Sequence, residues 1–136
     1  MANKSGTHWL AFYASAEPKG APLEMFDCYG MSPELHAFTH LGTRINSSSV
    51  SYQSLDTSVC GHYCLFFIFH RAHSLSYASV EQILLSQLHC ILSLCSTDAF
   101  ISRFIDSLQW AYRIILPCTR FAHSQTCLKK CFACYF

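Results

Sequence analysis

The segment that most constrains the fold of this chain begins at Cys60. From there, the sequence CGHYCLFFIFHRAHSL places apolar or aromatic side chains on most faces of a helix, which is typical of a helix buried nearly all round. We therefore expect a central helix with the other elements packed around it. The longest apolar run, Cys64 to Phe69, is far shorter than the roughly 18 residues that span a bilayer, so we predict no membrane segment.

Two short β-rich runs precede this helix. His8–Tyr13 (HWLAFY) and Leu23–Asp27 (LEMFD) are separated by a stretch rich in proline and glycine, residue types that favour turns. These two runs predict a β-hairpin. Tyr52–Leu55 is interpreted as either a short third strand or an ordered loop.

Two amphipathic helices are predicted after the central one. Apolar side chains recur at spacings of three and four residues from Val80 to Cys95 and again from Phe100 to Leu108, with Thr97 or Asp98 as the N-cap of the second helix. Strands followed by helices predict an α+β fold, with a small, mainly antiparallel sheet packed on the central helix. We assign no element to Ala111–Phe136, because it shows no clear period.

Composition and charge limit what such a chain can do. With 136 residues there is room for one domain, and 51% hydrophobic against 12% charged residues predicts a packed core rather than disorder. A formal net charge of +1 does not support binding to nucleic acid. The chain has nine cysteines and opens without an apolar signal-peptide segment, which indicates a reducing compartment, so we expect the nucleus or the cytoplasm.

Four residues together fit the requirements of a cysteine nucleophile. Cys60 begins the central helix, whose N-terminus favours a thiolate and directs backbone N–H groups at the sulfur. His8 and Asp27 lie on the two hairpin strands, where the carboxylate could fix the tautomer of the imidazole. Gln53 lies seven positions before Cys60, so its amide and the Cys60 N–H could form an oxyanion hole. The alternative is four unrelated residues, with Cys60 as an inert, buried thiol.

Three segments of the sequence resemble the adenovirus-type cysteine protease (adenain) family, in particular its Maverick or Polinton transposon members. These segments are HWLAFY, LEMFDCYG and YQSLDTSVCGHYCLFF. More distantly they resemble the Ulp-type SUMO proteases. That clan has the catalytic order His, Asp or Glu, Gln and Cys, followed by Gly, and the chain matches it with His8, Asp27, Gln53, Cys60 and Gly61.

The resemblance implies a papain-like fold and a thiol protease, a hydrolase that cleaves protein substrates after glycine. Viral and transposon members process precursor proteins in this way. A Ulp-type enzyme that removes ubiquitin-like modifiers is an alternative, because it shares the residue order. The resemblance is close over about residues 6–75 and looser over 76–110, so we predict a protease domain at 1–110 and an unassigned, cysteine-containing tail at 111–136.

The chain also departs from the family. Only seven residues precede His8, so the N-terminal lobe that family members carry is expected to be missing, and a partner protein could cover the surface it leaves. A further alternative is therefore a catalytically inactive remnant that acts, if at all, by binding. No cysteine lies between Cys28 and Cys60 to anchor the peptide cofactor of the adenoviral enzymes, and the charge does not favour their DNA cofactor, so we predict no cofactor.

Two sets of cysteines and histidines have spacings that could suit a zinc ion, and we predict a zinc site at neither. One combines Cys60 and Cys64 with nearby histidines, but Cys64 is better explained as a small core residue one turn below the nucleophile. The other lies in the tail and has a spacing close to that of zinc ligands without a second ligand pair on folded scaffolding. Its members are His123, Cys127, Cys131 and Cys134.

Overall fold

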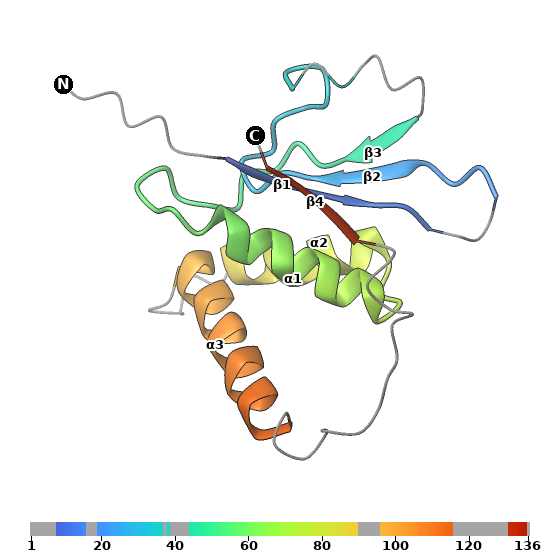
Figure 1. Ribbon diagram of the computed structural model, residues 1–136. Helices are drawn as coiled ribbons and strands as arrows, with labels where there is room; N and C mark the ends of the chain where they lie inside the picture. Colours follow the sequence, from blue (N-terminus) through green and yellow to red (C-terminus); the bar gives the residue numbers. More distant parts are fainter. Residues whose placement is uncertain are drawn as a thin grey trace.

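The computed structural model describes residues 8–15, 19–36, 38, 44–89, 96–115 and 131–135, and the side chains of all of these except 112–115 and 131–135. It has the α+β composition predicted above, with a sheet on one side and three helices on the other (Figure 1). The elements are β1 (Trp9–Tyr13), β2 (Leu23–Phe26), β3 (Ile45–Ser47), α1 (Cys60–Ala72), α2 (Tyr77–Leu88), α3 (Thr97–Ile115) and β4 (Cys131–Tyr135).

The predicted hairpin is the centre of the sheet. β1 and β2 pair antiparallel, with Ala11 opposite Phe26 and Tyr13 opposite Glu24, and the strand order is β3-β2-β1-β4. β3 pairs parallel with β2, and β4 pairs antiparallel with β1. The sheet is thus antiparallel except at the β3 edge.

Three parts of the sheet and helices differ from the sequence prediction. Tyr52–Leu55 forms no strand, because the N–H groups of Tyr52 and Gln53 both donate to the carbonyl of Cys28 instead of to a strand partner. The third strand is Ile45–Ser47, which is too short to show an alternating pattern. Ala111–Phe136, to which no element was assigned, contributes the end of α3 and the strand β4.

The core lies between the sheet and α1. Phe67 is fully buried and stacks on Phe26 of β2, with the ring centroids 4.8 Å apart, while Phe66 packs edge to face against Phe104 of α3. Burial of α1 is incomplete, since Leu65 on the same helix is 55% exposed. The apolar composition of this helix therefore predicted its central place correctly and overestimated how much of its surface is covered.

An ion pair joins the far end of α1 to the sheet. Arg71 Nε lies 2.5 Å from Glu24 Oε2 and Arg71 Nη2 lies 2.9 Å from Glu24 Oε1, a bidentate arrangement between two mostly buried side chains. The guanidinium also lies 4.5 Å from the centre of the Tyr13 ring. Such a planar, two-point contact fixes the direction of α1 relative to β2.

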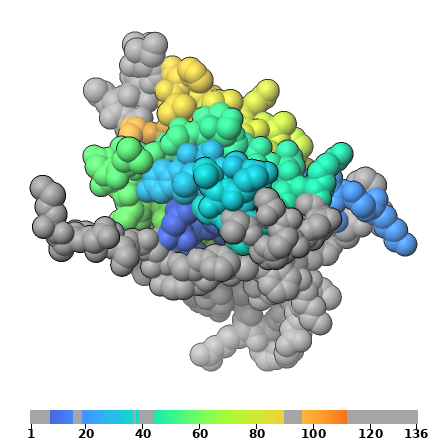
Figure 2. Space-filling view, turned by 90° about the horizontal axis from the view of Figure 1, so that it is seen from above, coloured from blue at the N-terminus to red at the C-terminus, as the bar shows by residue number. Residues whose placement is uncertain are grey.

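Two loops meet at the opposite end of α1. In the space-filling view, the chain that follows β2 (blue to cyan) lies against residues that precede α1 (green), as the bonds from Tyr52 and Gln53 to Cys28 require (Figure 2). Gly30 allows this contact. It has φ +68, and a Cβ at this position would lie 2.7 Å from backbone atoms of Ser49 and Val50.

None of the helices that the structure describes combines the length and the apolar character that a membrane crossing requires.

Replacing Gly30 with alanine should destabilise the protein far more than the same change at Gly20. Both glycines have positive φ, a conformation that lowers the stability of an alanine variant by about 1 kcal/mol. Nothing lies within 4 Å of a Cβ at Gly20, whereas Gly30→Ala also forces the two loops apart, which adds about 1–3 kcal/mol. Urea denaturation of both variants measures the difference, and equal losses of stability would show that the close approach at Gly30 is unimportant.

Candidate functional site

The candidate site is built around Asp27, which directly follows β2. Its side chain is only 1% exposed, yet both carboxylate oxygens have hydrogen-bond partners. Oδ1 lies 3.0 Å from Nε2 of His8 and accepts the backbone N–H of Tyr29 at 2.8 Å, in a turn typical of aspartate. Oδ2 lies 2.7 Å from Nε2 of His36. A buried carboxylate is expensive unless it is satisfied in this way.

His8 immediately precedes β1, so strand pairing brings it beside Asp27, as the hairpin predicted. Because Nε2 faces Asp27, the other ring nitrogen, Nδ1, is left over. Nδ1 is buried and has no hydrogen-bond partner among the described residues. The aspartate thus holds the imidazole in the tautomer with its proton on Nε2, and Nδ1 has its lone pair available.

His36 was missed by the sequence analysis. It lies in the turn at residues 33–36, where no strand or helix period points to a buried side chain, but its side chain is only 16% exposed. Its ring stacks on that of His8, with centroids 5.9 Å apart and an interplanar angle of 20°. The Asp27 carboxylate therefore contacts two histidines, one at each oxygen.

Cys60 is the first residue of α1, as predicted, and is 7% exposed. The residue before it, Val59, provides no side-chain cap, and the first turn of the helix holds no acidic residue. The partial positive charge of the helix N-terminus is therefore not offset by an acidic side chain of that turn. Such a position favours a negatively charged sulfur.

Two other buried thiols lie near Cys60. Burial is the main reason that the pKa of the Cys28 thiol is raised far above its usual range, and Asp27 adds to the effect. Burial also raises the pKa of Cys64 to about 12, with a further contribution from the charge of Cys60. Both groups are therefore neutral thiols near neutral pH, which makes them poor nucleophiles.

Gln53 is buried next to this cluster. Its carbonyl oxygen accepts a hydrogen bond from Cys28 Sγ at 3.0 Å, and its amide donates to the Thr57 carbonyl at 2.9 Å and to Thr57 Oγ1 at 3.3 Å. The glutamine thus bridges the loop after β2 and the loop that leads into α1. In the structure its amide hydrogens are used within that loop.

Asp98 fixes the loop from the side of α3. It was predicted as a possible N-cap, but Ser96 accepts the N–H of Ala99 in that role. The Asp98 carboxylate accepts hydrogen bonds from Tyr63 Oη at 2.7 Å and Thr57 Oγ1 at 2.8 Å. Through these bonds, α3, α1 and the loop that carries Gln53 are joined at one buried carboxylate.

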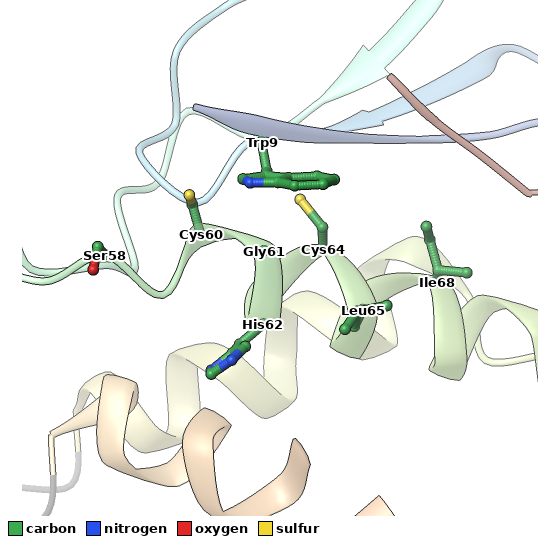
Figure 3. Close-up of a pocket in the computed structure, with 8 residues that line it drawn as sticks. All are labelled: Trp9, Ser58, Cys60, Gly61, His62, Cys64, Leu65 and Ile68. Carbon is green, nitrogen blue, oxygen red and sulfur yellow. The ribbon is translucent and has the colours of Figure 1, made fainter. Parts of the chain in front are cut away.

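A pocket of roughly 430 Å³ opens beside Cys60 (Figure 3). The indole of Trp9, from β1, covers Gly61 and Cys64, and the thiols of Cys60 and Cys64 point toward the strand (Figure 3). The pocket wall farther along α1 is formed by Leu65 and other apolar side chains. Leu65 also borders a second apolar hollow between α1 and α3, so the apolar surface continues beyond the pocket.

The described residues place one set of metal-binding side chains close together: His8, Asp27 and Cys28 have ligand atoms within 4.8 Å of one another. The Asp27 carboxylate and the Cys28 thiol are already hydrogen-bonded, and the thiol is protonated, so the set fits a hydrogen-bonded network better than a metal centre.

Of the two zinc sets considered from the sequence, the structure describes the side chains of the one at Cys60 and Cys64. His62 points away from the two thiols at Cys60 and Cys64 (Figure 3). In the tail set, His123 and Cys127 lie outside the described residues, and only the backbone of Cys131 and Cys134 is described.

Comparisons of the chain with models of protein families, with curated proteins and with solved structures find no match. The case for a function therefore rests on the residues of this site and on the sequence pattern that predicted four of them.

Replacing Tyr63 with phenylalanine should destabilise the fold by about 1–3 kcal/mol, because the buried Asp98 carboxylate then loses its shortest hydrogen bond. Tyr29→Phe is the matched control, since the Tyr29 hydroxyl is not bonded to this carboxylate, and it should have a smaller effect. Equilibrium unfolding in urea measures both. If the Tyr63→Phe variant were as stable as the unmodified protein, the bond between Tyr63 and Asp98 would not be what holds α1 and α3 together.

Proposed function

We propose that the protein is a cysteine endopeptidase, with Cys60 as nucleophile, His8 as general base and acid, and Asp27 as the group that orients His8. The observation that carries the proposal is the buried His8–Asp27 pair, which leaves His8 Nδ1 unpartnered among the described residues. A histidine in this state has a free lone pair and a fixed orientation, the two properties that a general base needs.

The position of Cys60 supports its role as the nucleophile. Cys60 begins α1 and its thiol points toward β1 (Figure 3). His8 directly precedes β1 in the chain. The ring of Tyr29 lies 5.0 Å from the His8 ring, and the charge of Cys60 is among the causes that raise the pKa of the Tyr29 hydroxyl. Tyr29 is therefore close to the His8 ring and within electrostatic reach of the Cys60 thiol.

In the proposed reaction, His8 Nδ1 takes the thiol proton and Cys60 Sγ bonds to the carbonyl carbon of the substrate peptide bond. The C–N bond breaks as the imidazolium returns this proton to the leaving amine, which leaves a thioester on Cys60. Water then gives a proton to His8 and adds to the thioester carbon. The C–S bond breaks, the carboxylic acid leaves, and the proton returns to the sulfur.

Gln53 is proposed to stabilise the oxyanion together with the N–H of Cys60. In the free protein the amide of Gln53 donates both of its bonds to Thr57, at 2.9 and 3.3 Å. The longer bond, to Thr57 Oγ1, is the weaker one and is the one that an oxyanion would replace. The bond from Cys28 to the carbonyl oxygen would keep the amide oriented during this exchange.

The proposed substrate is a protein segment with glycine at the cleavage site, as the resemblance to adenain-type proteases implies. The pocket beside Cys60 supports a segment with glycine near the thiol, because the residue after Cys60 that lines it is Gly61, which has no side chain, and the indole of Trp9 lines it as well. The packing of α1 against an antiparallel sheet, with the thiol at the helix start, is compatible with a papain-like relationship, which is part of the proposal.

The mechanism predicts that Cys60→Ser lowers hydrolysis of glycine-containing peptides by about 10³-fold or more, because a serine hydroxyl is far harder to ionise than a thiol. Cys64→Ser, one turn further along α1, is the matched control and should retain activity, since the Cys64 thiol is neutral. The measurement is release of a fluorophore from peptides with glycine before the scissile bond. Full activity in Cys60→Ser would refute the assignment of the nucleophile.

His8→Ala should slow the same hydrolysis by about 100-fold or more, the usual contribution of a general base. His73→Ala is the control, because His73 is an exposed histidine at the far end of α1. Steady-state rates of the two variants, compared at the same pH, give the result. If both variants kept the full rate, His8 would not be the base.

Covalent probes distinguish an endopeptidase from a Ulp-type enzyme that removes ubiquitin-like modifiers. A short peptide that ends in glycine and carries an electrophile should form an adduct with Cys60 as readily as a ubiquitin-like protein with the same electrophile. A strong preference for the ubiquitin-like probe would replace the endopeptidase assignment with a deconjugating one. Failure of both probes to label Cys60 would favour an inactive binding protein, and mass spectrometry of the adducts decides among these outcomes.

A further inference from the structure

We propose that His36 is a positioning residue of this site: it anchors the Asp27 carboxylate that orients His8. The inference rests on the proposed function for its effect on Cys60, but its physical basis is the pair of contacts to Asp27. His36 Nε2 lies 2.7 Å from Oδ2, and His8 Nε2 lies 3.0 Å from Oδ1.

The contacts of His36 give it a defined orientation. Its side chain is 16% exposed, and the centre of its ring lies 5.9 Å from that of His8 and 6.0 Å from that of Phe38. His8 and the N–H of Tyr29 hold Oδ1, and the bond from His36 to Oδ2 holds the second oxygen, so the carboxylate is held at both oxygens. His36 therefore acts on the thiol only through Asp27 and His8.

The hydroxyl of Tyr29 and the thiols of Cys28 and Cys64 also lie around Asp27. Burial raises the pKa values of all three, so they stay neutral near neutral pH. Among the described side chains, the imidazoles of His8 and His36 are therefore the groups that hold this carboxylate.

The test compares His36→Gln, which keeps an N–H donor toward Asp27, with His36→Leu, which removes it. The imidazole N–H proton of His8, followed by NMR in the full chain, should exchange with water faster in His36→Leu than in the unmodified protein and at an unchanged rate in His36→Gln. His73→Gln, a change of an exposed histidine, should leave this exchange unchanged. Circular dichroism establishes that each variant is folded.

The reaction of Cys60 with a glycine electrophile supplies the second measurement. His36→Leu should react about tenfold more slowly, because the Asp27 carboxylate then loses one of its hydrogen bonds and holds His8 less firmly, while His36→Gln should keep the rate. Unchanged N–H exchange at His8 and an unchanged rate in His36→Leu would overturn the anchoring role. Faster exchange in His36→Leu with no reaction at Cys60 in any form would support the anchoring role and refute the proposed protease.

Discussion

The arrangement of the site depends on the burial of one carboxylate. Asp27 is almost inaccessible to solvent, and a charge in such a place is tolerated only because the His8 ring, the His36 ring and the N–H of Tyr29 surround it. Each partner comes from a different part of the chain, so the carboxylate fixes the start of β1 and the turn at 33–36 relative to the end of β2. A structural need, the satisfaction of a buried charge, thereby also sets the tautomer of His8.

Among the described residues, the buried thiols of Cys28, Cys60 and Cys64 illustrate how location alone separates the proposed nucleophile from inert groups. Cys28 and Cys64 are enclosed, and burial holds both in the neutral form. Cys60 is also mostly covered, but it occupies the first position of α1, where the N–H groups of the helix end favour negative charge, and it borders the pocket under Trp9. In the proposed mechanism this difference, and not a difference in residue type, selects the nucleophile.

The sequence predicted the parts of the fold and site that depend on local pattern. Turn residues between two β-rich runs predicted the hairpin, and the hairpin placed His8 beside Asp27; the start of an apolar run predicted that α1 begins at Cys60. His36 could not be predicted, because it lies in a turn and reaches Asp27 only through the tertiary fold. β3 and β4 were missed because pairing across long separations creates these strands from segments without a strong pattern of their own. The exposure of Leu65 was missed because composition does not show which face of a helix has a neighbour.

The central claim is that His8, held by Asp27, activates Cys60. The most direct test is the rate at which Cys60 is alkylated across pH in the intact chain, read by mass spectrometry with the other cysteines as internal references. The account predicts that Cys60 is the cysteine alkylated fastest near neutral pH, while Cys28 and Cys64, whose pKa values are raised by burial, stay slow. A Cys60 that reacts only at the alkaline pH of an ordinary thiol, at the same rate as its neighbours, would contradict it.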